Sequence, residues 1–369
     1  MRTPVGKLAV LVALVMSSAL AAAQEEAPAS KLAPRNARFD LKAWGLRAKW
    51  RQDVVQRIEG RIRALHCTGK YVVAETEKNR IFCIDNEQGT WENAAVLRAP
   101  LLRAPVDALE GQLLLVVDST VYPFTVKTAE LGEAWRPGLP VHTRPILHKR
   151  TAIVTSAAGR IAAVDLETGT REWTARTKGV ITYRPLAVGL TVLTTGYGAE
   201  VTATGVVQGV PQWTWKPQKP AKISSGLAAD EENVYVGDNR GHIYALNIGA
   251  GGLTWQIIAN AAIEGQPRMV GKKLLVLTRA PGLNCVEVVD DAPRITWTYA
   301  GAREIVATGE NTAYVRLADG IVAAVSIENG KELWRDRLPD DCMIVGDADK
   351  GVFYVSDTQV VVAFGPPED

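Results

Sequence analysis

Short runs in which every second side chain is hydrophobic recur along the chain. The stretch 159–173 (GRIAAVDLETGTREW) has an alternating run, a polar turn that contains a glycine, and a tryptophan that opens the next run. A two-residue period predicts β-strands, and the polar piece predicts a hairpin turn. The 3.6-residue period of helices is missing from these repeats, so the pattern predicts an all-β fold.

The unit recurs about every forty residues. The stretches 241–255 and 320–334 align with 159–173 without gaps, and 199–213 is a fourth copy. The positions that mark the repeat are tryptophans and the glycines four residues before them. They are Trp50, Trp91, Trp135, Trp173, Trp213, Trp255, Trp297 and Trp334, with Gly169, Gly209, Gly251 and Gly330. Four short strands in each unit of this length are typical of a β-propeller blade.

The chain ends determine how the ring closes. The last unit, 340–364, offers three strands and no fourth, whereas a closed ring leaves no open sheet edge. Trp50 stands 41 residues before Trp91, so the segment 39–52 has the spacing of a missing fourth strand. We therefore predict an eight-bladed β-propeller of four-stranded antiparallel blades, closed by an N-terminal strand. The alternative is an amphipathic helix, because the apolar residues of 39–60 also have helical spacing.

The N-terminus has the features of an export signal. Two basic residues precede an apolar run, 8–23, which ends in small residues. This pattern predicts a signal peptide over 1–23, followed by a flexible lead-in over 24–38 and a propeller over 39–366. The run is shorter than the roughly 20 residues of a spanning helix. We expect a periplasmic or secreted protein without a membrane span. No cysteine directly follows the apolar run, so we expect no lipid anchor at the cleavage site.

Composition narrows the function classes. The 42 Lys and Arg nearly balance the 40 Asp and Glu, and removal of 1–23 leaves equal numbers, which argues against nucleic acid as a partner. The four cysteines, Cys67, Cys83, Cys285 and Cys342, form no CxxC motif, so their pairing stays open. The histidines (His66, His142, His148 and His242) lack metal-ligand spacing, and we expect them on the surface or in loops.

The repeat G-x-[IV]-x-A-[VL]-[DNS]-x-x-x-G-x-x-x-W resembles that of the pyrroloquinoline-quinone-like (PQQ-like) propeller family. The resemblance implies one of two roles. One is a quinone-dependent oxidoreductase that holds quinone and calcium in the central channel. The other is the non-catalytic BamB type, which contacts a partner during assembly of outer-membrane proteins. In either case the repeat's tryptophans and glycines correspond to the positions where blades dock.

The residues favour the non-catalytic role. The family's dehydrogenases are longer chains, and many carry adjacent cysteines that this sequence lacks. Calcium needs six to eight oxygen ligands, yet the acidic runs at 230–232 and 238–241 are expected to be solvated turns. We therefore predict no enzyme activity, no cofactor and no metal. The expected role is that of a monomeric interaction scaffold with a protein partner in the cell envelope.

Four residues are candidates for binding that partner. Arg144 and Arg184 each precede a proline at the start of a predicted inner strand, so they are expected at equivalent places facing the channel mouth. Two such arginines could bind an anion or a carboxylate, or they could pair with nearby acids. Tyr183 and Tyr197 add aromatic surface, for contact or for packing. A glycan-binding module is a further alternative, with Trp44 or Trp215 as its exposed aromatic residue.

Overall fold

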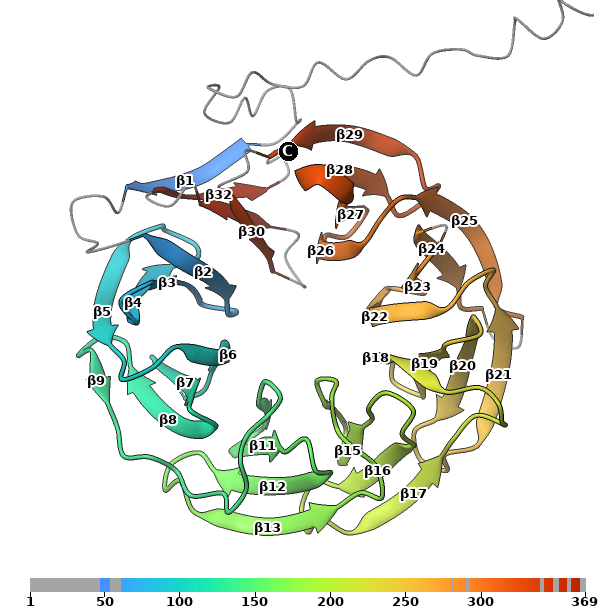
Figure 1. The fold of residues 1–369 in the computed structure, drawn as a ribbon, viewed down its shortest axis with the longest axis horizontal. Helices are drawn as coiled ribbons and strands as arrows, with labels where there is room; N and C mark the ends of the chain where they lie inside the picture. The colour runs from blue at the N-terminus through green and yellow to red at the C-terminus, as the bar shows by residue number, and fades with distance from the viewer. Residues whose placement is uncertain are drawn as a thin grey trace, which may run out of the picture.

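The structure is a computed structural model. It describes residues 47–53, 61–109, 111–280, 282–289, 292–338, 342–347, 352–356 and 360–365. These residues form eight four-stranded antiparallel sheets, arranged as a ring around a central axis (Figure 1). The prediction of an all-β propeller with four-stranded blades is confirmed. The predicted signal peptide, the lead-in and Trp44 lie outside the described residues.

We number the blades along the chain and name their strands from the axis outward. Blade 1 is β2 (Ile62–Cys67), β3 (Tyr71–Thr76), β4 (Arg80–Asp85) and β5 (Trp91–Val96). Blade 2 is β6 (Leu101–Asp107), β7 (Gln112–Val117), β8 (Thr120–Thr125) and β9 (Glu130–Leu131). Blade 3 is β10 (Ile146–His148), β11 (Thr151–Thr155), β12 (Arg160–Asp165) and β13 (Arg171–Arg176). Blade 4 is β14 (Leu186–Val188), β15 (Thr191–Thr194), β16 (Val201–Gly205) and β17 (Pro211–Trp215).

The second half of the ring continues this order. Blade 5 is β18 (Ile223–Ala229), β19 (Asn233–Asp238), β20 (His242–Asn247) and β21 (Leu253–Ile258). Blade 6 is β22 (Ile263–Val270), β23 (Lys273–Thr278), β24 (Gly282–Glu287) and β25 (Arg294–Ala300). Blade 7 is β26 (Glu304–Thr308), β27 (Thr312–Arg316), β28 (Ile321–Ser326) and β29 (Glu332–Arg337), with a 3-10 turn, η1 (Ala318–Gly320). Blade 8 is β30 (Met343–Gly346), β31 (Phe353–Ser356), β32 (Val360–Gly365) and β1 (Arg47–Asp53).

Blade 8 joins the two ends of the chain. Seven sheets are built from strands that are consecutive in sequence, whereas β1 completes the sheet β30–β31–β32 (Figure 1). The β1 strand pairs antiparallel with β32, from Arg47 opposite Gly365 to Asp53 opposite Val360. The described part of the N-terminal segment is thus a closing strand and not a helix. Across the described ranges, no helix is long and apolar enough to cross a membrane.

The core lies between neighbouring sheets. Middle strands are buried on both faces, as in β3, where all six residues are buried, whereas outer strands alternate, as in β13. Aliphatic side chains from adjacent blades pack into shared clusters, such as the one that joins β7 of blade 2 to β12 of blade 3. Each blade therefore buries its faces against its neighbours, which explains why the repeat needs a ring.

The repeated tryptophans and glycines meet across the seams between blades. Gly209 has φ +68°, and a Cβ there would lie 2.4 Å from Cε3 of Trp173 in the preceding blade. The Trp173 indole also donates to the carbonyl of Val206, at 2.8 Å. The pairs Trp135–Gly169, Trp213–Gly251 and Trp297–Gly330 make the same close contact, as does Trp50–Gly89. Because Trp50 in β1 docks on blade 1 in this way, the ring closes with the same contact that joins four other pairs of neighbouring blades.

Candidate functional site

The antiparallel strand order determines which loops share an end of the molecule. In each blade, the turn between the second and third strands and the connection to the next blade lie at one end, which we call the rim end. The other two turns lie at the opposite end. The rim-end segments of blades 3 to 5 are 156–160, 176–184, 195–200, 216–222 and 238–241. Three of the four predicted binding residues, Tyr183, Arg184 and Tyr197, lie in these segments.

Arg144 and Arg184 occupy equivalent places in adjacent blades. Each lies four residues before the last paired residue of its inner strand, His148 in β10 and Val188 in β14. Their environments differ, however, because Arg144 is partly buried and Arg184 is exposed. Equivalent sequence positions thus place one arginine among neighbouring blades and the other on the surface.

Arg144 contacts main-chain atoms of the two preceding blades. Its Nη2 donates to the carbonyl of Pro105 at 2.6 Å and to that of Cys67 at 3.4 Å. Burial, together with the nearby charge of Arg184, lowers the pKa of Arg144 to about 10. The Arg144 side chain therefore links blade 3 to blades 1 and 2 by hydrogen bonds. The sequence alone did not indicate this structural role.

The two tyrosines also divide between packing and exposure. The Tyr183 hydroxyl donates to the carbonyl of Ser224 in blade 5, at 2.7 Å. Burial and the neighbouring Tyr197 raise the pKa of Tyr183. Tyr197 itself is 58% exposed and lies in the second turn of blade 4. Of the four predicted residues, Arg184 and Tyr197 are therefore the two that a partner could reach.

The rim-end loops of blades 3 to 5 touch one another through positions without side chains. A Cβ on Gly159 would lie 2.2 Å from the carbonyl oxygen of Gly179, and one on Gly196 would lie 2.4 Å from that of Val180. Further along, Lys222 and Asn239 exchange hydrogen bonds of 3.0 Å. These contacts make the rim of three blades one continuous surface with little freedom to shift.

This surface carries a strong positive charge. The five rim-end segments hold eight arginines and lysines but only two carboxylates, whereas the turns at the opposite end of the same blades hold three cations and five carboxylates. We define the basic rim as six of the seven exposed cations among the eight, leaving out Arg184: Arg176, Lys178, Lys216, Lys219, Lys222 and Arg240. The neutral composition of the whole chain conceals this separation of charge.

The two carboxylates on the rim do little to balance these cations. Asp238 is fully buried and accepts hydrogen bonds from the main-chain N–H groups of Arg240 and His242 and from the Tyr244 hydroxyl. The expectation that this turn is solvated is wrong for Asp238, because its carboxylate stabilises the turn from inside. Glu200 has a side chain 22% exposed and lies 3.5 Å from Lys216. The basic rim thus keeps most of its charge.

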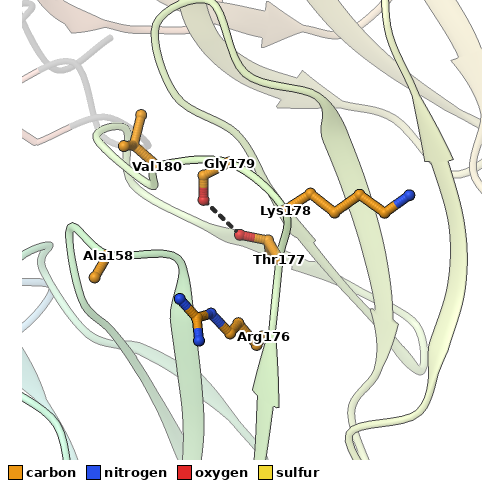
Figure 2. A pocket seen from close by; sticks show the side chains of 6 residues that line it. All are labelled: Ala158, Arg176, Thr177, Lys178, Gly179 and Val180. Atoms are coloured by element: carbon orange, nitrogen blue, oxygen red, sulfur yellow. Dashed lines mark hydrogen bonds between the residues drawn. The ribbon is translucent and has the colours of Figure 1, made fainter.

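A pocket of about 550 Å³ opens beside the basic rim. It is lined by Ala158 and by the connection 176–180 between blades 3 and 4. Figure 2 shows that Arg176 points toward the turn of Ala158, whereas Lys178 extends the other way; the Thr177 hydroxyl donates to the Gly179 carbonyl at 2.8 Å. Val180 contributes an apolar wall and is 46% exposed. The pocket therefore combines an apolar wall, a cation and main-chain polar groups.

Other candidate chemistry receives less support. Within the described ranges, no group of three or more His, Cys, Asp or Glu is arranged to hold a metal ion. The four cysteines are free thiols, three of them buried. The prediction for the histidines is wrong for His66, His148 and His242, which are partly buried and lie in strands β2, β10 and β20. His66 and His242 lie beside the carboxylates of Glu75 and Asp238. Trp215 is half-buried, with its ring 4.8 Å from that of Tyr244, so it is no open glycan platform.

The chain is similar to known assembly factors. A family model described as outer membrane protein assembly factor BamB matches residues 47–220 and 198–364. The proteins of that name from Moranella endobia and Shewanella oneidensis are 25% identical over 130 residues and 26% identical over 129 residues. Each alignment covers 32% of this chain and 32% of the relative. The aligned part therefore spans about a third of the length of these curated relatives.

Solved structures show the same fold. The crystal structure of BamB from Moraxella catarrhalis superposes with a TM-score of 0.67 at 14% identity, covering 87% of this chain and 97% of that one. The computationally designed protein Ika8 superposes with a TM-score of 0.66, also at 14% identity, covering 84% and 99%. At these identities the likeness concerns the fold.

Proposed function

This chain belongs to the family of the outer membrane protein assembly factor BamB, and on that premise we propose that it is a non-catalytic scaffold which presents the rim of blades 3 to 5 to a protein partner in the cell envelope. Export through the predicted signal peptide would place it in the periplasm or outside the cell. The family match supports the scaffold role, and the site geometry supports the location of the docking face.

The observation that carries the proposal is the combination of features on one rim. Exposed Tyr197 and Val180, the pocket lined by 176–180 and the basic rim lie on loops that contact one another. Interfaces favour an aromatic anchor and a pocket at the centre, with charges around them that orient the partner. The turns at the opposite end of blade 3 also line a pocket, of about 900 Å³, but at that end of blades 3 to 5 carboxylates outnumber cations.

The mechanism is the presentation of a surface that is already ordered. The Tyr183 hydroxyl donates a hydrogen bond to the Ser224 carbonyl. The Arg144 guanidinium donates hydrogen bonds to the carbonyls of Pro105 and Cys67. These contacts hold the loops around Arg184 and Tyr197 before any partner arrives. A surface that needs no ordering loses less entropy on binding, so modest contacts give a specific complex.

The alternatives gain no specific observation. A quinone-dependent oxidoreductase of this family would need calcium ligands, and the described residues offer no carboxylate cluster of that kind. A glycan-binding module would need an exposed aromatic platform, whereas Trp215 packs against Tyr244.

The test is capture of a partner by the chain 24–369 from envelope extract. We expect one stoichiometric envelope protein, lost when Arg184→Ala and Tyr197→Ala are combined. The pair avoids Arg144 and Tyr183, whose replacement would disturb contacts between blades. Lys272→Ala/Lys331→Ala, at the opposite end of blades 6 and 7, is the matched control and should capture the same protein as the wild type.

The same preparation is scanned for quinone absorbance and assayed for calcium. Capture that the rim pair leaves unchanged would contradict the proposed face. Co-purified quinone with stoichiometric calcium would replace the scaffold with an oxidoreductase.

A further inference from the structure

The basic rim has more charge than its own chain can neutralise. Across the described residues, a carboxylate comes within 4.0 Å of only one of its six cations, namely Glu200 beside Lys216. Like charges gathered on one surface raise its potential and attract groups of opposite sign. The missing counter-charge is expected on whatever binds there.

The cations are arranged around apolar groups. The turn that carries Tyr197 lies between the connections 176–184 and 216–222. It contacts the first at Gly196, where a Cβ would lie 2.4 Å from the Val180 carbonyl oxygen, and the second at Gly198, where a Cβ would lie 3.9 Å from Cδ of Lys222. Arg176 and Lys178 thus lie on one side of Tyr197, and the three lysines of 216–222 lie on the other. An apolar centre with cations on both sides suits a ligand that alternates apolar and acidic groups.

On these grounds we propose that the basic rim binds an extended acidic segment of a protein partner, in which carboxylates flank apolar side chains. The inference rests on the proposed docking function and names the chemistry of its partner. An extended segment sends successive side chains to opposite sides, so it can place an apolar residue against Val180 or Tyr197 while its neighbours approach the cations. Affinity from such exposed ion pairs is modest and falls with salt.

The pocket favours a polypeptide over an anionic membrane. A bilayer surface would meet the tips of the lysines, but it would leave the pocket beside Val180 unfilled. A peptide segment supplies a side chain that can enter the pocket.

The test measures binding of defined probes by fluorescence anisotropy. A labelled ten-residue peptide of alternating Glu and Val is compared with one of alternating Lys and Val, at about 0.05 and 0.15 M salt. We expect the acidic peptide to bind more tightly at low salt and the basic peptide not to bind. Lys216→Glu/Lys219→Glu/Lys222→Glu should weaken the acidic peptide at least about tenfold. The control Lys127→Glu/Lys272→Glu/Lys331→Glu makes the same charge change at the opposite end and should bind it as the wild type does.

Equal weakening in both triple variants would overturn the proposal, because it would show attraction to net charge alone. Binding to vesicles of phosphatidylglycerol, but not to the acidic peptide, would overturn it in favour of a lipid surface. Capture from envelope extract separates this proposal from the docking function. If the rim triple variant captures the same protein as the wild type while the Arg184/Tyr197 pair does not, the docking face stands and the acidic segment falls. If neither change affects capture, the docking face falls as well.

Discussion

The seams between blades and the rim of blades 3 to 5 are built on opposite principles. At the seams, the same tryptophan–glycine contact recurs at five places, and at Trp173–Gly209 and Trp50–Gly89 it is made on a buried glycine. On the rim, side chains are exposed: Arg176 and Lys216 share the position three residues after the repeat tryptophan, whereas Tyr197 has no aromatic counterpart in the equivalent turns of blades 3 and 5. Repeated buried positions thus hold the ring, and exposed positions are the ones available for a partner.

The largest effect is expected where the ring closes. Trp50→Ala would remove a buried indole that packs on Gly89 and donates to the Asn86 carbonyl at 2.7 Å. We expect the free energy of unfolding to fall by about 3–5 kcal/mol, measured by chemical denaturation. Hydrogen exchange should rise first in β32, which would lose its partner β1. A loss no greater than that of an exposed tyrosine, Tyr197→Ala, would show that this seam is dispensable.

A second pair of variants isolates the seam contact from backbone strain. Gly209 and Gly189 both have positive φ, +68° and +55°, but a Cβ would strike Trp173 at 2.4 Å only at Gly209, whereas nothing lies within 4 Å at Gly189. Gly209→Ala should cost about 3 kcal/mol and Gly189→Ala about 1 kcal/mol. Thermal and urea unfolding of the two proteins measure the difference. Equal losses would assign the whole cost to the backbone and none to the tryptophan.

The seams were largely predictable, since the repeat itself carries them. Glycine four residues before tryptophan at regular spacing predicts both the turn and the docked indole, and the period places Trp50 in the closing strand. The role of Arg144 was not predictable, because its partners Pro105 and Cys67 lie 39 and 77 residues away and approach only when the ring forms.

The basic rim was missed for a different reason. Five of its six cations occur in two short connections, 176–184 and 216–222, but the net charge of the chain averages them with the acidic turns at the opposite end. The sequence shows that these connections are basic. Only the antiparallel strand order brings them to one end of three adjacent blades.

The seam between blades 1 and 2 contains a buried carboxylate, that of Glu75. Glu75 of blade 1 is buried and accepts hydrogen bonds from the Leu101 N–H of blade 2 at 2.8 Å and from Arg63 of its own blade. Burial alone would raise the pKa of its carboxyl, but the hydrogen bonds from His66 and Leu101 and the charge of Arg63 hold this pKa below the ordinary value of 4.5.

A lowered pKa means that the folded state favours the charged carboxylate. Its contribution to stability is therefore complete above pH 4.5 and is lost as the pH falls through the lower folded-state value. Glu75→Gln should cost about 1–2 kcal/mol at neutral pH and should flatten the stability profile below pH 4.5. Denaturant midpoints of both proteins across this range provide the measurement. Parallel profiles would show that Glu75 does not govern the acid response.

The smallest effect on stability is expected at the rim. Lys216→Glu/Lys219→Glu/Lys222→Glu changes exposed side chains with one carboxylate neighbour, so the free energy of unfolding should shift by less than about 0.5 kcal/mol per site. The same variant should bind the acidic peptide more weakly while it stays folded. The seam variants should lose peptide binding only when they unfold. A triple variant that unfolds as readily as Gly209→Ala would erase the distinction between the two regions.

Site-specific photo-crosslinking tests the docking face most directly. A benzoylphenylalanine placed at Tyr197 on the rim is compared with one at Glu231, at the opposite end of blade 5, in cells that export the full chain. The account predicts that Tyr197 yields one discrete cross-linked envelope protein and that Glu231 does not yield it. The same product from both positions, or from Glu231 alone, would contradict the assignment of docking to the rim of blades 3 to 5.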